Sequence, residues 1–277
     1  MPRLHIFTLS WEALPLLQQL KESLLPTLKG INYSWHIKDN GSTDGTALVL
    51  DEWSKSNNSI FAHAYPDNKQ TFSEGMNWLY QKAKPKSEDY ILLLNNDVIF
   101  NDTTSIHNMI DTLNDDVGCV GARLLFTRTN QLQHAGVVFH PQSRTPYHFR
   151  SGDDSDAASK QNRYFQAVTG AVFLTKAKYY AGACQTNKSG NNGLDENLKW
   201  AFDDIDLSLS IAKNFNKKII YCGKTDIYHA ESVSLKKNPL NKLFLKSNLN
   251  YFLSKWHNKY VADAYHYLQD KNYNLVK

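Results

Sequence analysis

The sequence predicts an α/β protein with a Rossmann-like, mostly parallel sheet covered by helices on both faces. Two observations support this fold class. Short strand-like runs alternate with helix-length amphipathic stretches through the first half of the chain, and the most apolar run, ILLL at 91–94, ends in the polar residues NND. Such alternation is typical of consecutive βαβ units. A chain of 277 residues can hold one large domain of this class with an appendage.

The expected elements follow one another in order. The first half predicts strand 4–9, helix 12–29, strand 33–38, a helix after Thr43, strand 59–64, helix 72–84 and strand 90–94. The middle, 117–175, has more strand patterns and is interrupted by RSGDDSDAASKQNR, which predicts a flexible surface loop. From Leu235 onward the pattern is helical again, and Pro239 suits the first turn of that helix.

Composition limits the class of protein. Hydrophobic residues make up 42% of the chain, yet no apolar run approaches the roughly 20 residues that a membrane span needs. Polar residues interrupt the N-terminal stretch too often for a secretory signal, so we expect a cytoplasmic protein. Cys119, Cys184 and Cys222 are far apart and form no CxxC pair, which favours buried thiols over a zinc site or disulfides.

The net charge of +4 is concentrated at the C-terminal end of the chain. Residues 231–277 contain eight lysines and three acidic residues, so the remainder is close to neutral. A near-neutral main domain argues against nucleic-acid binding.

The stretch DNGSTDGT, residues 39–46, follows a predicted strand and has more than one interpretation. Its Asn-Gly and Asp-Gly pairs are turn signals, and Ser42, Thr43 or Asp44 could cap the next helix. The stretch loosely matches a calcium loop, but a strand enters it where an EF-hand has a helix. Phosphate loops of the GxxxxGK[ST] and GxGxxG types are absent from the sequence.

Acidic and amide side chains stand at the ends of several predicted strands. Asp39 ends one strand, Asp67 and Asn68 follow the next, and Asp97 ends the central one. Ligands of parallel sheets bind at the carboxyl ends of the strands, so these groups are expected to converge. Carboxylates gathered in one place repel each other unless a cation lies among them. A divalent metal with a nucleotide diphosphate fits this arrangement.

Five segments in order resemble family 2 glycosyltransferases of the GT-A fold: HIKDNGSTDGT, ILLLNNDV, VGARLLF with LQHAG, VTGAVFLTKA, and LDENLKWAFDDIDLSLSIAK with IIYCGKTDIYHAES. The resemblance is to inverting, rhamnosyltransferase-like members of bacterial glycan assembly. It implies transfer of a sugar, of hexosyl or deoxyhexosyl type, from a nucleoside-diphosphate sugar to a hydroxyl of a glycan or lipid-linked glycan. It also implies a catalytic domain over 1–230, with a nucleotide-binding half (1–115) and an acceptor half (116–230), followed by a basic helical tail (231–277).

The resemblance assigns site residues by position. For nucleotide binding they are Thr8, Leu9, Asp39, Asn40, Asp67 and Asn96, and for the donor sugar they are Thr169, Gly170 and Ala171. Asp97 and His229 match positions that hold Mn²⁺ or Mg²⁺. Asn95 replaces the first acid of the family's DXD motif, so we expect weak binding of metal without the donor. A lone histidine such as His229 is also often structural, and glycine in VTGAVF could instead mark a bulge.

FDDIDLS matches the family's ED motif, whose second acid is the general base. By position the base is Asp204, and Asp203 takes the place of the Glu and is next in line. Acids at a helix start can also act as caps, and the local pattern fits either a strand or a helix; the resemblance favours a helix. Trp200 and His134, in LQHAG, are candidates for the acceptor side.

Two questions remain open in the sequence. The lysine-rich tail could lie on an anionic membrane surface, or its apolar stripe could pack on the catalytic domain, which is the commoner fate. The rival functions are a sugar nucleotidyltransferase, whose glycine-rich basic loop is missing from TLSWEALP, and a non-enzymatic protein that binds nucleotides or glycans. Retention of Asp97, Asp204 and His229 weighs against the second rival.

Overall fold

The computed structural model describes residues 2–64, 69–185, 187–199, 201–230, 241–270 and 272–276. The strands are β1 (Leu4–Ser10), β2 (Tyr33–Asp39), β3 (Ile60–Ala64), β4 (Tyr90–Leu94), β5 (Val98–Phe100), β6 (Val117–Phe126), β7 (Leu132–His134), β8 (Val137–Phe139), β9 (Pro146–His148), β10 (Arg163–Phe165), β11 (Val172–Lys176) and β12 (Lys218–His229). The helices are α1 (Leu14–Thr27), α2 (Thr46–Ser56), α3 (Phe72–Ala83), α4 (Ser105–Thr112), the 3₁₀ turn η1 (Ala158–Lys160), α5 (Ala177–Ala183), α6 (Asp203–Phe215), α8 (Asn241–Trp256) and α9 (Ala264–Gln269).

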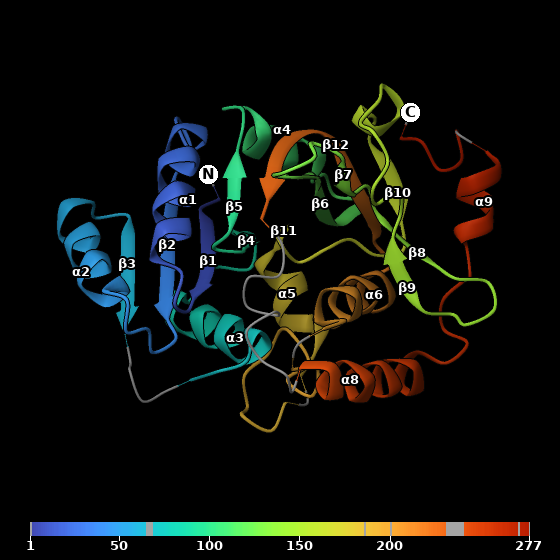
Figure 1. Ribbon diagram of the computed structural model, residues 1–277. Coiled ribbons are helices and arrows are strands. Elements are labelled where there is room, and N and C mark those ends of the chain that lie inside the picture. The colour runs from blue at the N-terminus through green and yellow to red at the C-terminus, as the bar shows by residue number, and fades with distance from the viewer. Residues whose placement is uncertain are drawn as a thin grey trace.

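One large sheet forms the centre of the molecule (Figure 1). Its strand order is β10-β12-β6-β11-β4-β1-β2-β3, with β5 paired to β12 and β7 paired to β6. Strands β3, β2, β1 and β4 are mutually parallel and are called the first sheet half. Strand β11 runs antiparallel to both β4 and β6, and β12 runs parallel to β6. Strands β11, β6, β12 and β10, with β5 and β7, are called the second sheet half. The predicted α/β class with a mostly parallel sheet is confirmed.

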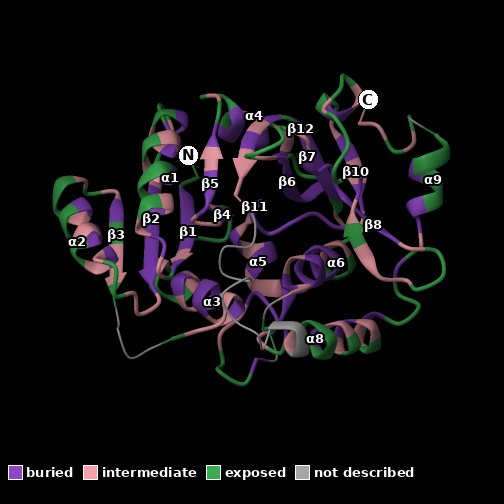
Figure 2. Ribbon diagram, in the orientation of Figure 1, coloured by how far each residue is buried: buried purple, intermediate pink, exposed green. Residues whose placement is uncertain are grey.

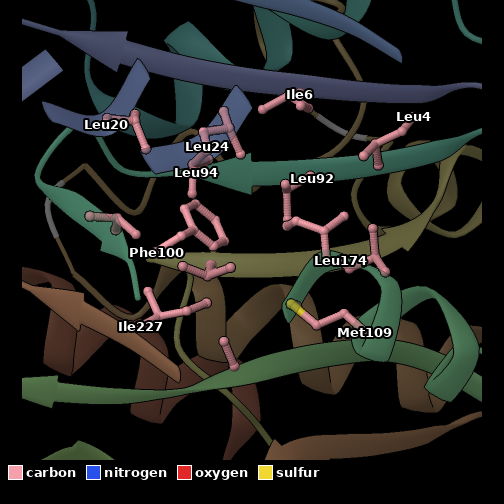
Figure 3. Packing of buried hydrophobic residues seen from close by; sticks show 14 of the residues in the cluster. Leu4, Ile6, Leu20, Leu24, Leu92, Leu94, Phe100, Met109, Leu174 and Ile227 are labelled. Carbon is pink, nitrogen blue, oxygen red and sulfur yellow. The ribbon is translucent and has the colours of Figure 1, made fainter. Parts of the chain in front are cut away.

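Helices cover both faces of the sheet and enclose two hydrophobic cores. Apolar side chains of α1, α2 and α4 pack on one face, and those of α3, α5 and α6 pack on the other. In Figure 3, Leu92 and Leu94 of β4 lie among side chains from several elements, including Leu24 of α1 and Met109 of α4. These four side chains are fully buried, and each burial of this size contributes roughly 1.5–3 kcal/mol. The ILLL run is therefore the central strand because both of its faces are covered.

Helix α3 is placed against the end of β1 by local sequence signals. Thr71 and Glu74 form a capping box that starts the helix, since each side chain bonds the other residue's backbone N–H. A Cβ atom at Gly75 would lie 2.9 Å from Leu9 Cδ1, so glycine allows α3 to approach the end of β1 closely. The helix thus lies next to the strand ends where polar residues gather.

The polar loop RSGDDSDAASKQNR, residues 150–163, was predicted to be flexible but contains several internal hydrogen bonds. Arg150 donates hydrogen bonds to Asp153 Oδ2 at 2.9 Å and Asp156 Oδ1 at 2.8 Å. The backbone N–H of Ser159 in η1 donates to Asp156 Oδ1 at 2.8 Å. The loop lies at the surface, as expected, but charged side chains fold it on itself.

The described part of the C-terminal segment packs against the rest of the domain. Phe252 and Trp256 of α8 are buried with Ile205 and Leu209 of α6, while other positions of α8 are exposed (Figure 2). Further on, the ring of Tyr267 stacks on Phe165 with centroids 4.5 Å apart. The described part of the apolar stripe around Phe252 therefore packs on the domain, as in the second of the two alternatives. Pro239 and Leu240 lie outside the described residues.

Two smaller expectations concern cysteines and membranes. All three cysteines are buried thiols, as predicted. In the part of the chain that the structure describes, no helix has the length and apolar character needed to cross a bilayer.

Candidate active site

The loop after β2 is joined to the loop after β1. Asp39 is buried, and its Oδ1 accepts hydrogen bonds from Ser42 Oγ at 2.5 Å and Ser42 N at 3.2 Å. Ser42 Oγ also accepts from the backbone N–H of Glu12 at 2.9 Å, and Glu12 Oε1 accepts from Thr43 N at 2.8 Å. The small polar residues of DNGSTDGT therefore fix two neighbouring strand ends relative to each other.

The Asp44 side chain accepts hydrogen bonds at the starts of two helices. Its Oδ2 accepts from Leu14 N, the first residue of α1, at 2.9 Å, and its Oδ1 accepts from Thr46 N and Thr46 Oγ1 at the start of α2. One carboxylate thus bonds the N-termini of two helices, whose dipoles favour negative charge there. Asp44 therefore bonds the start of the next helix, as the capping prediction expected. Of the two acids in this stretch, Asp39 is the one at the end of β2.

The predicted nucleotide-binding residues gather at the ends of β1, β2 and β4. Asn40 Oδ1 accepts from Gln70 N at 2.8 Å and from the buried Lys38 Nζ at 3.2 Å, while Asn40 Nδ2 donates to Gln70 O at 2.8 Å. Asn96 Nδ2 donates to Ser10 Oγ at 3.1 Å. Asn40 therefore orders the loop that leads into α3, and Asn96 links β4 to β1.

The two predicted nucleotide residues at the end of β1 differ in exposure. Thr8 is fully buried, and its Oγ1 accepts from Trp35 Nε1 at 3.0 Å. Leu9 packs against Gly75 of α3 and is partly buried. The Thr8 side chain is therefore closed to a ligand, whereas part of the Leu9 side chain is accessible. Asp67 lies outside the described residues.

The predicted metal ligands, Asp97 and His229, lie together. Asp97 Oδ1 is 3.1 Å from His229 Nε2, because β12 pairs with β5 and sets His229 opposite Val98, the residue after Asp97. Gln133 Oε1 accepts from His229 Nδ1 at 2.7 Å, and Gln133 Nε2 donates to His229 O at 3.3 Å. The second bond fixes the orientation of the amide, so the proton of a neutral His229 is on Nδ1 and the lone pair is on Nε2.

This donor set fits a divalent cation. A lone pair on His229 Nε2 and a carboxylate oxygen 3.1 Å apart repel each other unless a cation or a hydrogen-bond donor lies near them. Asn95 Nδ2, a donor, is 3.3 Å from His229 Nε2. A carboxylate and an imidazole with its second nitrogen held by a hydrogen bond also suit Mn²⁺ or Mg²⁺. The described residues contain no cluster of three or more His, Cys, Asp or Glu side chains placed to hold a metal, so other ligands must complete the shell.

The segment Thr169–Ala171 connects this pair to the proposed base. Asn95 N donates to Ala171 O at 2.9 Å, and Gly170 N donates to Asp204 Oδ2 at 2.7 Å. A Cβ atom at Gly170 would lie 2.9 Å from Asp204 Cβ, so only glycine lets α6 come this close. Three predicted groups of residues are thereby joined in one continuous hydrogen-bonded path.

Asp203 and Asp204, the first two of the three acids of FDDIDLS, lie in the first turn of α6 but in different environments. Asp203 is buried, whereas Asp204 is partly exposed. Burial, together with the neighbouring Asp204 charge, raises the pKa of Asp203 to about 8. At neutral pH the buried acid therefore keeps its proton, while the accessible Asp204 accepts two backbone hydrogen bonds, from Gly170 and Ile205.

Of the two predicted acceptor residues, the structure describes only His134. His134 is fully buried, and its Nε2 accepts from Thr169 N at 3.4 Å, so its side chain supports the donor-sugar segment and has no exposed surface for an acceptor. Burial lowers its pKa well below the usual range, which keeps the ring neutral. Trp200 lies outside the described residues.

Sequence reasoning missed Gln133, the residue next to His134. In a strand, neighbouring side chains point in opposite directions, so in β7 Gln133 reaches His229 while His134 reaches Thr169. The motif LQHAG contained the signal, but histidine drew attention because of its chemistry. Lys255 was also missed as a partner of the acidic helix start.

Comparisons with solved structures identify the fold. Among solved structures, GalNAc-T7 with UDP, GalNAc and Mn2+ aligns with a TM-score of 0.61 and 10% identity, covering 83% of this chain and 44% of that one. The mannosyltransferase PcManGT from Pyrobaculum calidifontis, in complex with GDP-Man and Mn2+, aligns with a TM-score of 0.56 and 12% identity, covering 97% of this chain and 79% of that one. At such low identity these similarities define the fold, which is the GT-A fold of glycosyltransferases.

The sequence comparison identifies the family. The model of the family described as Glycosyl transferase family 2 matches residues 9–174, more than half of the chain. The chain therefore belongs to glycosyltransferase family 2. A search of curated proteins gave no match.

Proposed function

We propose that the protein transfers a hexosyl or deoxyhexosyl unit from a nucleoside-diphosphate sugar to a hydroxyl of a glycan or lipid-linked glycan, with inversion at the anomeric carbon. Family membership and the GT-A fold support sugar transfer. The observation that carries the rest is the path from Asp97 and His229 through Asn95, Ala171 and Gly170 to Asp204. The Asp97–His229 pair and the Asp204 carboxylate lie at the two ends of this path, which supports a metal on one side of the segment 169–171 and a base on the other.

On the donor side, Asp97 and His229 would hold Mn²⁺ or Mg²⁺ together with oxygens of the diphosphate. When bound, the metal acts as a Lewis acid that neutralises charge on the departing diphosphate. Gln133 keeps the His229 lone pair directed at Asp97, and the backbone at the end of β1 with Asp39 faces the nucleoside. The diphosphates of the two solved relatives, UDP and GDP-Man, are of the same chemical class.

On the acceptor side, Asp204 takes the proton of the attacking hydroxyl. The acceptor oxygen forms its bond to the anomeric carbon as the bond to the diphosphate oxygen breaks on the opposite face, which gives one inversion. Asp204 is accessible, whereas Asp203 is buried and protonated, so the two neighbouring acids have separate roles. Glycine at position 170 lets the Asp204 carboxylate lie directly against the segment proposed to bind the donor sugar.

Thermal unfolding tests the donor side. Sugar nucleotides and free nucleoside diphosphates are added with and without Mn²⁺ to the native protein, Asp97→Ala, and the control Asp51→Ala, which removes an exposed pair with Lys55. Ligand at 100 times its dissociation constant should stabilise the fold by about 2.7 kcal/mol. We expect a Mn²⁺-dependent shift for one nucleotide class in the native protein and the control, and its loss in Asp97→Ala. An equal shift in Asp97→Ala, or none with any nucleotide, contradicts the proposal.

A further inference from the structure

Helix α8 reaches the first turn of the helix that carries the proposed base. Lys255 Nζ lies 2.8 Å from Asp206 Oδ1 and 2.6 Å from Asp195 Oδ2, and Trp256 Nε1 donates to Asp206 Oδ1 at 2.6 Å. The two carboxylates are almost fully buried, with 2% and 3% of their side-chain surface exposed. Contacts of this kind between a C-terminal helix and the start of α6 exceed what packing of an apolar stripe requires.

Asp195 brings a further element into the same cluster. It belongs to the loop before α6, whose neighbour Leu194 is bonded through both N and O to the Asn77 side chain of α3. Tyr251 of α8 also donates to Asp195 Oδ2 at 2.9 Å. Lys255 therefore connects α6 with a loop that α3 holds, and α3 starts beside the nucleotide-binding loops.

The charge balance of this region depends on a cation. Asp203, Asp204 and Asp206 all lie in the first turn of α6, and Asp206 stands one turn after Asp203 on the same face. Burial opposes the charge on Lys255, but Asp206 and Asp195 more than compensate and raise the pKa of Lys255. Lys255 is itself partly exposed, but its two carboxylate partners are buried, so removing the cation leaves buried charge without a partner, which is costly.

We propose that Lys255, with Trp256, is a positioning residue for the base: through Asp206 and Asp195 it fixes the first turn of α6 and sets the electrostatic environment of the Asp203–Asp204 pair. The catalytic reading of this pair rests on the proposed function. Helix α8 is then part of the catalytic apparatus, although none of its described side chains needs to touch a substrate.

The electrostatic consequence has a definite sign. Removing the Lys255 charge leaves the charge of Asp206 uncompensated beside Asp203, so the acidic pair should hold its proton to higher pH. Removing the charge of Asp206 instead should let the pair ionise at lower pH. The other ionisable groups that face the pair or the cluster stay the same in both variants: Asp195 and Glu196 of the loop, Tyr180 of α5 and Tyr251 of α8.

The test follows the titration of the pair directly by NMR of the full chain labelled with ¹³C-aspartate, with Asp203→Asn and Asp204→Asn for assignment. We expect Lys255→Met to raise the midpoint and Asp206→Asn to lower it, each by about one pH unit, the size expected for a unit charge several ångströms away. Lys255→Arg, and the control Lys246→Met on an exposed position of α8, should leave the midpoint unchanged.

Several outcomes overturn the inference. It fails if Lys255→Met and Asp206→Asn shift the midpoint in the same direction, or if neither shifts it. If Lys255→Met does not fold, Asp206→Asn decides alone, because asparagine can still accept from Trp256 and Lys255. With an active native enzyme, folded Lys255→Met should lose at least about tenfold in kcat with little change in the KM for donor. No sugar transfer by the native protein together with the expected NMR shifts would contradict the proposed function and not the positioning.

Discussion

In the first sheet half, the two acids of the DNGSTDGT loop each have a hydrogen-bond partner next to them in the chain, whereas in the second sheet half the groups that hold a site residue come from distant segments. Ser42 bonds Asp39 from three residues away, and Thr46 bonds Asp44 from two. Gly170 bonds Asp204 across 34 residues, Lys255 bonds Asp206 across 49, and Gln133 bonds His229 across 96. A βα loop can therefore supply part of the support of the proposed donor site locally, although Asn40 is still held by Gln70 across 30 residues. The proposed metal and base positions depend on the assembled fold.

The largest effect is expected where the chemistry itself is removed. Asp204→Asn keeps an oxygen that can accept from Gly170, so the fold and donor binding should be unchanged. Transfer should fall by about 10²–10⁴, the usual range for loss of a general base. Donor binding is measured by thermal unfolding, and transfer is measured by release of nucleoside diphosphate with the acceptor present. Near-native turnover would move the base elsewhere and would remove the main reason for assigning chemistry to the second sheet half.

A smaller effect is expected from a supporting residue of the second sheet half. Gln133→Met keeps the side-chain volume but frees His229 to rotate, so Mn²⁺ affinity in the presence of nucleotide should fall by about 10–100-fold. Mn²⁺ titration in the presence of the diphosphate measures it. Gln142→Met, at an exposed position of the turn between β8 and β9, is the matched control. Equal affinities in the two variants would show that His229 needs no distant support.

The same contrast explains what could be predicted from the sequence. The helix and strand alternation of the first half is written in local periodicity, and polar residues at strand ends mark the site because parallel strands end at one edge. The placement of β11 between β4 and β6 is set by long-range pairing, which leaves no local signal. His134 was expected on the acceptor side, yet β7 is buried on both faces, and the side chain that reaches the Asp97–His229 pair belongs to Gln133. Lys255 looked like one lysine among many in a basic tail until its buried partners were known.

The smallest effect is expected from Asp44, which can be compared with Asp39 of the same loop. Asp44→Ala removes the acceptor for the backbone N–H groups of Leu14 and Thr46, and loss of a helix cap typically costs about 1 kcal/mol. The Asp44 side chain is exposed and is not part of the path that joins Asp97 to Asp204, so the Mn²⁺-dependent stabilisation by nucleotide should persist. Chemical unfolding measures the stability. Asp39→Asn changes the acceptor of the Ser42 hydrogen bonds in the same loop. It serves as the comparison variant and should weaken nucleotide binding. If Asp44→Ala abolished nucleotide binding as well, the loop would act as one unit, and local organisation in the first sheet half would be as interdependent as the network of the second.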